Sequence, residues 1–265
     1  MNGIGNDFVL LNAMEGLPQT DLSALARRLC DRESGFGADG LILAVPAAGD
    51  ADFRMRFYNA DGSEAELCGN GARCLARFGY MCGLSDTHPR FETAAGTVTA
   101  ERIGESVYRI ALAPPALVEL DRRVDLPERS LLTDYLLVGV PHALLPVAGL
   151  RNLSTDDLRP LAKALRFAPE YPAGANVNFF EQTGKDEIFL RTFERGVEDF
   201  TLACGTGAAS AVSALTLRGV LSGKGCRVTS AGGTLTVDAE RTGDRITALS
   251  LTGETCIEYT GDTDI

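Results

Sequence analysis

Hydrophobic and polar residues alternate with a two-residue period in many short segments, which is the pattern of a strand with one buried face. We expect strands at 7–12, 41–45, 52–59, 91–101, 107–112, 135–145, 176–181 and 187–194, and short strands around 227, 235, 246 and 257. Longer Ala- and Leu-rich stretches predict helices at 20–32, 72–81, 154–166 and 208–218, with Thr20 and Ser154 as caps. Many short strands and few helices favour the α+β class.

One short motif occurs twice, with its cysteines at positions 68 and 204. Leu67–Ala72 has the sequence LCGNGA, and Ala203–Ala208 has the sequence ACGTGA. Each copy follows a strand pattern and precedes a helix pattern, so Cys68 and Cys204 are each expected at the start of a helix. The repeat predicts that the chain consists of two related halves.

A cysteine at a helix start has a specific chemical environment. Backbone N–H groups without helical partners and the positive end of the helix dipole lower a thiol pKa from about 8.5 toward neutrality. The glycines of each motif let an anion approach the backbone closely. The alternative is a gene duplication whose cysteines merely pack, but packing does not require Gly on both sides of one variable residue.

Two such thiols permit inversion at a carbon centre. If the two halves face each other with pseudo-twofold symmetry, one thiolate can remove an α-hydrogen while the other thiol delivers a proton from the opposite face. The N–H groups of the motifs would bind the substrate carboxylate and stabilise the enolate-like charge that develops on it. This chemistry requires no metal and no organic cofactor.

Charge and composition exclude several classes of partner. The 265 residues carry a net charge of -11 with no basic run, so we expect no nucleic-acid partner. Three lysines occur, all outside the repeated motif: Lys163, Lys185 and Lys224. A Schiff-base cofactor such as pyridoxal phosphate is therefore disfavoured. The most apolar stretch, 131–150, is interrupted by Asp134, Pro141 and His142, which predicts a buried strand pair and no membrane span.

The cysteine count predicts reduced thiols. Seven cysteines are an odd number, and with no secretory leader we expect a cytoplasmic protein without a disulfide framework. Zinc is disfavoured because Cys68 and Cys74 lack the spacing of a structural site, and His88 and His142 are the only imidazoles. The cysteines outside the motifs are expected to be small buried residues: Cys30, Cys74, Cys82, Cys226 and Cys256.

In order along the chain, the motifs resemble those of the diaminopimelate epimerase family. The similar segments are 3–8 (GIGNDF), 35–40 (GFGADG), 57–64 (FYNADGSE), 68–73 (CGNGAR), 141–142 (PH), 176 (N), 194–196 (ERG) and 203–207 (ACGTG). The resemblance covers nearly the whole chain. It implies conversion of LL-diaminopimelate to the meso form, a step of lysine and peptidoglycan precursor biosynthesis, without metal or cofactor.

The resemblance also implies a role for each matching residue. Cys68 and Cys204 look like the base and the acid. Four residues are expected to offer backbone N–H groups to the reacting carboxylate: Gly69, Asn70, Gly205 and Thr206. Five are expected to bind the rest of the substrate, with Arg195 and the asparagines at the distal carboxylate and Glu194 at an ammonium: Asn6, Asn59, Asn176, Glu194 and Arg195. A guanidinium holds a carboxylate bidentately, which suits these residue types.

His142 and Glu194 are expected to tune which thiol is ionised. The alternative for His142 is a buried histidine that satisfies a backbone carbonyl.

The family fold is implied as well. We expect two pseudo-symmetric domains, each an antiparallel β-barrel-like sheet around a central helix, with the active site in the cleft between them. The predicted domains are 1–113 plus 250–265 and 114–249, with a boundary near Pro114 and Pro115, which break strands. A small-molecule substrate and a homodimer are the only partners expected.

The chain departs from the family at three positions. Val140 precedes the Pro-His pair where Asn is common, Gly40 stands where some members have a substrate-contacting Gln, and Phe200 replaces a usual acidic residue. These departures bear on the recognition of the distal end of the substrate. The alternatives are a related racemase of the proline or histidine type, a dithiol redox protein, and a non-catalytic binding protein. Proline racemases usually carry His in the first motif, where this chain has Asn70.

Overall fold

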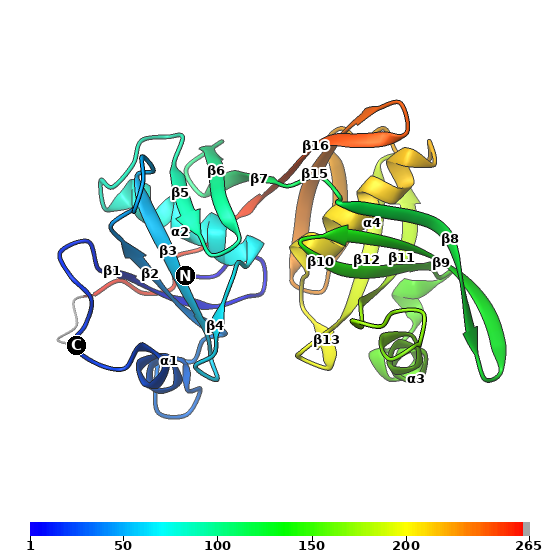
Figure 1. The fold of residues 1–265 in the computed structure, drawn as a ribbon, viewed down its shortest axis with the longest axis horizontal. Helices are drawn as coiled ribbons and strands as arrows, with labels where there is room; N and C mark the ends of the chain where they lie inside the picture. The colour runs from blue at the N-terminus through cyan, green and yellow to red at the C-terminus, as the bar shows by residue number, and fades with distance from the viewer. Residues whose placement is uncertain (262–265) are drawn as a thin grey trace. The chain divides into compact units, whose positions relative to one another are not determined.

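The structure is a computed structural model that describes residues 1–261, and the chain in it divides into two units (Figure 1). Unit 1 comprises Met1–Ala111 and the segment from Thr252 onward, and unit 2 comprises Leu112–Leu251. Each unit consists of a mixed β-sheet and two α-helices. The expected α+β class is therefore confirmed.

Unit 1 has the helices α1 (Leu22–Cys30) and α2 (Gly69–Met81). Its strands, in sheet order, are β1 (Phe8–Asn12), β2 (Gly40–Val45), β3 (Phe53–Asn59), β5 (Arg90–Thr93), β6 (Gly96–Arg102) and β7 (Val107–Leu112). The short β4 (Glu64–Ala65) pairs with β3. The pairs β1–β2 and β3–β5 are parallel, so the sheet is mixed and not purely antiparallel.

Unit 2 has a 3₁₀ turn η1 (Leu150–Asn152) and the helices α3 (Thr155–Arg166) and α4 (Gly205–Leu217). Its strands, in sheet order, are β8 (Leu117–Leu126), β9 (Arg129–Val138), β10 (Val140–Pro146), β11 (Asn176–Gly184), β12 (Glu187–Glu194), β14 (Cys226–Ser230), β15 (Gly233–Thr242) and β16 (Arg245–Glu254). The last residues of β16, from Thr252, belong to unit 1. The short β13 (Asp199–Thr201) pairs with β12. The pairs β10–β11 and β12–β14 are parallel.

The two units follow the same order of connections. In each, a parallel strand pair is joined through a helix, as β1–α1–β2 and as β10–α3–β11. An antiparallel neighbour follows, then a short strand that folds back on it, and then the helix that begins with the repeated motif. This shared topology extends the sequence repeat to the elements around each motif.

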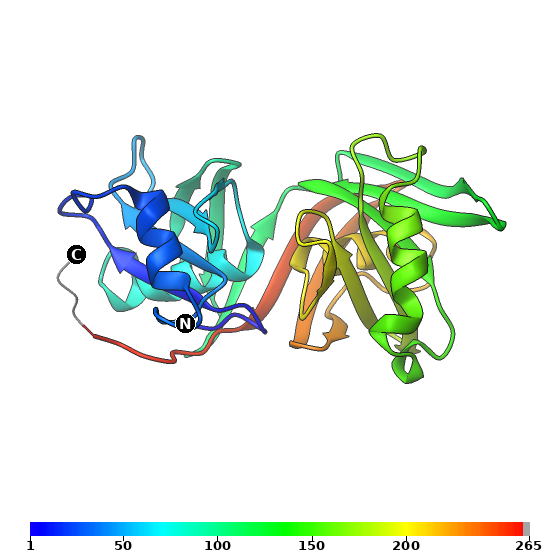
Figure 2. The ribbon, with the colours of Figure 1, turned by 90° about the horizontal axis from the view of Figure 1, so that it is seen from below.

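The alternation of side chains along β2 places a helix on each of its faces. Leu41, Leu43 and Val45 belong to a buried cluster with the apolar face of α1. Ile42 points to the other face, where its Cδ1 atom lies under Gly71 of α2. Figure 2 shows α1, in blue, lying across the strands of unit 1. Both faces of β2 are therefore covered, which explains its continuous apolar sequence.

The central strand of unit 2 has the same two-sided arrangement. Val177 and Phe179 of β11 pack in the cluster that contains the buried side of α3, which Figure 2 shows in green. Asn178 points to the other face, under Gly207 of α4. Ten of the thirteen residues of α4 are buried, and most of them are small. The helix can therefore approach the strands closely.

Five local expectations are corrected by the structure. Helix α1 is capped by Asp21, which accepts from the Ser23 N–H, and not by Thr20. The segment expected as one strand at 91–101 is the hairpin of β5 and β6. The segment expected as one strand at 135–145 is also a hairpin, because Gly139 has φ of 69° and turns β9 back into β10, which form the strand pair expected within 131–150. Strand β8 was not anticipated. Ile257 lies outside the strands, beside an isolated bridge at Cys256.

Candidate active site

Both repeated cysteines are the N-cap residues of helices, as the sequence predicts. Cys68 precedes α2 and Cys204 precedes α4, each with extended backbone angles. The first helical hydrogen bonds run from the Ala72 N–H to the Cys68 carbonyl at 2.8 Å and from the Ala208 N–H to the Cys204 carbonyl at 3.0 Å. The N–H groups of residues 69–71 and 205–207 therefore precede the helical ladder and form a positive end that favours an anion.

Close packing beneath each helix start explains the second glycine of the motif. A Cβ atom on Gly71 would lie 2.8 Å from Ile42 Cδ1, and one on Gly207 would lie 2.3 Å from Asn178 Oδ1. A Cβ atom on Gly207 would also lie 3.3 Å from Cys204 Sγ. The two helices therefore rest on their strands without room for a side chain at these positions.

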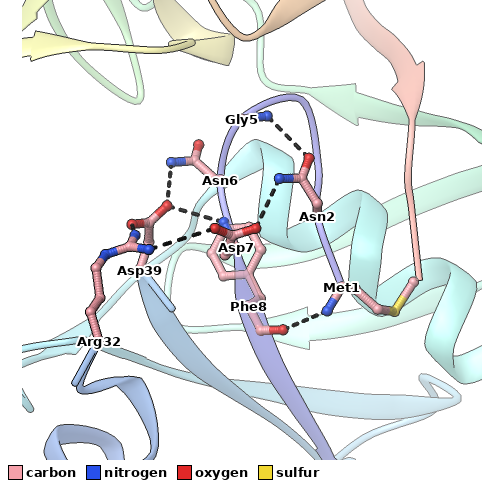
Figure 3. A network of polar contacts seen from close by, with 8 residues as sticks. All are labelled: Met1, Asn2, Gly5, Asn6, Asp7, Phe8, Arg32 and Asp39. Carbon is pink, nitrogen blue, oxygen red and sulfur yellow. Dashed lines mark hydrogen bonds and ion pairs between the residues drawn. The ribbon is translucent and has the colours of Figure 1, made fainter. Parts of the chain in front are cut away.

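Asn6 and Asn70 form a hydrogen-bonded pair in unit 1. The Nδ2 group of Asn70 donates to Asn6 Oδ1 at 2.7 Å, and Asn6 Nδ2 donates to Asp39 Oδ2 at 3.0 Å. Figure 3 shows Asn6 beside Asp39, which also accepts from Arg32 at 2.7 Å and from the Asp7 N–H at 3.0 Å. Since a carboxylate only accepts hydrogen bonds, Asp39 fixes the orientation of the Asn6 amide.

Asn70 is in turn held by a buried guanidinium. Arg73 Nη2 donates to Asn70 Oδ1 at 2.8 Å, and neither side chain is more than 2% exposed. Arg73 and Asp39 were not anticipated as site residues, although both lie within the motifs. Each is next to a predicted residue in space, a relation that the sequence alone does not give.

Asn59 is the last residue of β3, opposite Gly40 of β2. Its Nδ2 group donates to Ser63 Oγ at 3.0 Å, within the turn that leads to β4. Asn59 therefore lies at the same end of the unit 1 sheet as the start of β2.

A buried polar cluster lies on the α4 face of unit 2. Asn178 Nδ2 lies 3.1 Å from the carbonyls of Ala143 and Asn176 and 3.2 Å from Nδ1 of His142. Because both carbonyls only accept, the amide nitrogen must face them, and Nδ1 of His142 is placed as an acceptor. Thr192 Oγ1 donates to the other end of this amide, Asn178 Oδ1, at 2.8 Å.

His142 is fully buried and neutral. Burial lowers the pKa of His142 to about 3, and the positive charge of Arg195 acts in the same direction. With Nδ1 accepting, the ring proton resides on Nε2, which has no hydrogen-bond partner among residues 1–261. The ring therefore presents one buried N–H donor.

Asn176 and Arg195 are brought together at the ends of neighbouring strands. Asn176 begins β11 as the register partner of His142, and its Oδ1 accepts from the Arg195 N–H at 2.7 Å. Arg195 Nη1 donates to the Ala173 carbonyl at 2.9 Å. Glu194, the last residue of β12, directly precedes Arg195. Four predicted residues of unit 2 thus cluster at one end of its sheet.

The family of the chain follows from comparison with known sequences. The family model described as diaminopimelate epimerase matches residues 1–109 and 135–256. The chain belongs to the diaminopimelate epimerase family. It is 38% identical over 250 residues to the diaminopimelate epimerase of Aquifex aeolicus, covering 90% of this chain and 88% of that one. It is 33% identical to the enzyme of the same name from Synechocystis sp., covering 100% of this chain and 97% of that one. The chain is therefore an isomerase.

Solved structures show the same fold in more distant proteins. The chain resembles a hydroxyproline epimerase from Agrobacterium vitis with a TM-score of 0.70 and 21% identity, covering 96% of this chain and 86% of that one. It also resembles a phenazine biosynthesis protein of Bacillus anthracis with a TM-score of 0.72 and 16% identity, covering 96% and 92%. These likenesses support the expected two-part arrangement of barrel-like sheets.

Two of the three departures from the family pattern have a structural account. A Cβ atom on Gly40 would lie 2.6 Å from the Phe57 ring and 2.7 Å from the Tyr58 carbonyl, so a side chain there requires a shift of β3. Phe200 is partly buried and packs edge-on against Phe193 of the unit 2 core, at 5.5 Å between ring centroids. Val140 is partly buried opposite Val138, and nothing in the structure explains its choice over Asn.

The remaining cysteines differ from expectation at two positions. Cys30, Cys74 and Cys226 are buried as expected, and burial raises the pKa of Cys30 to about 11 and that of Cys74 to about 12. Cys82 and Cys256 are exposed, because they lie at the end of α2 and in the C-terminal segment. Within residues 1–261, no group of three or more His, Cys, Asp or Glu side chains is arranged to hold a metal ion. No helix in the same range is long and apolar enough to cross a membrane.

Proposed function

We propose that this chain interconverts LL- and meso-2,6-diaminopimelate by inverting one α-carbon, a step that supplies lysine and peptidoglycan precursors. The observation that carries the proposal is the presence of a cysteine at the N-cap of one helix in each unit, in a member of this family. The N-cap is where a backbone environment favours a thiolate, and a thiolate is the base that this reaction needs.

Cys68 and Cys204 act as a pair that holds one proton. The thiolate of one removes the α-proton of the substrate, and the thiol of the other delivers its own proton to the opposite face of the same carbon. The protonation states of the two sulfurs are then exchanged, so each direction of the reaction starts from a different form of the enzyme. Because the two groups titrate as a coupled pair, the rate has a bell-shaped dependence on pH.

The helix starts stabilise the charge that develops during proton transfer. As the α-proton leaves, negative charge spreads onto the substrate carboxylate. The N–H groups of Gly69, Asn70, Gly205 and Thr206 precede the helical ladders and are the donors for this carboxylate. Donors fixed before the reaction require little reorganisation in the transition state, which lowers the barrier.

The distal end of the substrate is bound by amides and one guanidinium. Asn6, Asn59, Asn176 and Arg195 bind the distal carboxylate, and Glu194 binds an ammonium group. The contacts of two asparagines support this assignment, since the Asn6 amide is oriented by Asp39 and Asn176 Oδ1 accepts from the Arg195 N–H. The nitrogen of Asn176 is then the end of the amide that can donate to a carboxylate.

His142 and Glu194 adjust the ionisation of the thiols. His142 is neutral, and its Nε2–H group is a donor that would stabilise a negative charge brought against it. Glu194 is the acidic counterpart, and its carboxylate would disfavour a thiolate beside it. Together they bias where the shared proton resides.

The enzyme consists of two catalytic halves, and both contribute residues that bind the substrate. The halves are residues 1–113 plus 250–265 and residues 114–249. The enzyme acts in the cytoplasm as a homodimer, on a small-molecule substrate, without metal or organic cofactor.

Incubation with LL-diaminopimelate in deuterium oxide tests the proposed function. We expect meso product that carries deuterium at the inverted α-carbon, because the delivering thiol exchanges its proton with solvent before transfer. Replacement of Cys204 by Ser should abolish both product and label, whereas Cys82→Ser, at the far end of α2, should leave turnover unchanged. Unlabelled or absent meso product from the folded wild-type protein would overturn the proposal.

The same assay separates the rival functions. L-Proline, trans-4-hydroxy-L-proline and L-histidine are offered under identical conditions, and inversion of one of them without turnover of diaminopimelate would identify a related racemase. A dithiol redox protein would turn over none of these substrates, and a binding protein would retain diaminopimelate without isotope exchange.

A further inference from the structure

A completely buried arginine lies in the first turns of α2, five residues after Cys68. Arg73 has 0% of its surface exposed. Its hydrogen bonds go to neutral oxygens, Asn70 Oδ1 at 2.8 Å and the Gly69 carbonyl at 3.5 Å. Its Nε group is buried and has no hydrogen-bond partner among the described residues. Burying a charged group among neutral partners costs free energy, so we expect an anion close to the Arg73 guanidinium.

The location of Arg73 adds to that cost. Its guanidinium reaches back to residues 69 and 70, toward the N-terminal end of α2, where the helix dipole is already positive. A cation is disfavoured at this end of a helix. Burial lowers the pKa of Arg73 to about 10, so the guanidinium is still charged at neutral pH.

Two sulfurs interact electrostatically with this cation, those of Cys74 and Cys68. Cys74 is fully buried, and burial raises its pKa to about 12, so it stays a thiol at neutral pH. Cys68 is the N-cap residue and is partly exposed. Of the two sulfurs, Cys68 is therefore the one that can supply the negative charge.

A chain of hydrogen bonds with fixed direction holds Arg73 in this place. Arg73 donates to Asn70, Asn70 donates to Asn6, and Asn6 donates to Asp39. The outer end is anchored by Arg32 and the Asp7 N–H, which both donate to Asp39 (Figure 3). Since one end of the chain can only donate and the other can only accept, neither amide can turn over without losing a bond.

The position of this cation differs between the two motifs. When the motifs are aligned on their cysteines, Arg73 corresponds to Ala209, in CGNGARC against CGTGAAS. Ala209 is fully buried in α4. Its side chain carries no charge, so the two motifs differ by one buried positive charge at this position.

We propose that Arg73 is the buried counter-charge of the Cys68 thiolate, so that in the ligand-free protein the proton shared by the two cysteines resides on Cys204. The proposal rests on the proposed function, because it assigns the resting state of that thiol pair. Arg73 acts through Cys68 and is a positioning residue with no contact to substrate.

Site-resolved alkylation of the full-length protein tests this assignment without any turnover. Iodoacetamide reacts with a thiolate, which forms a new S–C bond and expels iodide, so the rate at each sulfur reports its ionised fraction. The rates at Cys68 and Cys204 are followed between pH 5 and 10 by mass spectrometry of the two peptides. In the wild-type protein we expect Cys68 to react at least tenfold faster than Cys204 at pH 7. Equal rates, or faster reaction at Cys204, would overturn the proposal.

Variants then separate charge from structure. Arg73→Met should lower the alkylation rate of Cys68 at pH 7 about tenfold, while Arg73→Lys, which keeps the charge, should stay within about threefold of wild type. Arg77→Met is the matched control, since Arg77 lies one turn later on α2 and donates to Thr255, and it should change neither rate. Folding is checked by circular dichroism.

If Arg73→Met is folded and Cys68 keeps its wild-type rate, the assignment is wrong. If that variant does not fold, the wild-type comparison and Arg73→Lys still decide, because loss of Cys68 reactivity in the lysine variant contradicts a role for the charge. The isotope assay tests inversion independently, so failure of this proposal is distinguishable from failure of the proposed function.

Discussion

Helices α2 and α4 both begin after an N-cap cysteine with extended backbone angles, but α2 packs on apolar side chains and α4 on polar ones. In unit 1, Gly71 lies over Ile42 and Phe8, which are apolar, and the buried guanidinium of Arg73 donates to Asn70, two residues after the cysteine. In unit 2, Gly207 lies over Asn178 and Thr192, and alanine replaces the arginine. The duplicated topology has therefore kept the position of the thiol while its electrostatic surroundings have diverged.

This difference suits a reaction that needs two thiols but only one proton between them. Two identical environments would leave the location of that proton undetermined, whereas in our proposal the charge of Arg73 favours the thiolate at Cys68. The polar cluster of unit 2 supplies neutral donors and acceptors, which orient groups without adding charge. The repeat thus places a thiol at the start of one helix in each unit, and the differences between the two copies give the two thiols different electrostatic surroundings.

The largest expected effect comes from removing either thiol. Cys68→Ser and Cys204→Ser should each lower kcat about 10³-fold or more, because a serine hydroxyl is a poor acid and base near neutral pH. The equilibrium constant is fixed, so each variant must lower kcat/KM by the same factor in both directions. Kinetics from LL- and from meso-diaminopimelate would check this, and retention of wild-type kcat by either variant would break the two-thiol account.

The buried His142 should make the free energy of unfolding decrease as the pH falls. The pKa of His142 is about 3 in the folded protein and about 6.5 in the unfolded chain, so between these values only the unfolded chain binds the proton. Stability is therefore lost as pH falls from about 6.5 toward 3, by about 1.4 kcal/mol per pH unit for this one group.

Urea unfolding across that pH range measures the slope. His142→Gln should remove this contribution to the slope, whereas His88→Gln, which changes the exposed and only other histidine, should keep it. An unchanged slope in the His142 variant would show that the ring is not held neutral.

Overpacking should be more costly in unit 2 than in unit 1. Gly207→Ala places a methyl group 2.3 Å from Asn178 Oδ1 and should cost about 2 to 3 kcal/mol. The Asn178 amide cannot move away easily, because its Oδ1 accepts from Thr192 and its Nδ2 donates to two backbone carbonyls. Gly71→Ala meets the flexible end of Ile42 at 2.8 Å and should cost about 1 kcal/mol. Denaturant unfolding of both variants compares the two surfaces directly, and equal losses would contradict their difference in rigidity.

The smallest effect is expected at the outer end of the unit 1 chain. Arg32 is 62% exposed in its ion pair with Asp39, so Arg32→Ala should cost below about 1 kcal/mol of unfolding free energy. The Asp7 N–H still holds the carboxylate in this variant. A larger loss would mean that the hydrogen-bonded chain depends on its exposed anchor.

The sequence predicted the elements that local rules determine. The capping box at Ser154 and Asp157 begins α3, and positive φ at Gly83 and Gly219 follows the ends of α2 and α4. The start of each motif helix at its cysteine was also predicted, because a strand period changes to a helix period there. These features depend on a few neighbouring residues, which the sequence lists side by side.

The turn at Gly139 was missed, and so were features that depend on residues distant in the sequence. The turn at Gly139 lies within a continuous apolar run, so the alternation of β9 passes into that of β10 without a polar break. Arg73 and Asn178 read as ordinary residues of a helix and a strand. Both side chains are completely buried. Arg73 also belongs to a hydrogen-bonded chain in which Asn70 and Asn6 are 64 positions apart in the sequence. No periodicity in the sequence reports such contacts.

A crystal structure with a bound diaminopimelate analogue tests the central claim most directly. We predict that the sulfur atoms of Cys68 and Cys204 lie on opposite faces of one α-carbon, each roughly 3.5 Å from it, as proton transfer requires. A structure in which only one sulfur approaches that carbon, while the other lies in an unrelated part of the molecule, would contradict the account.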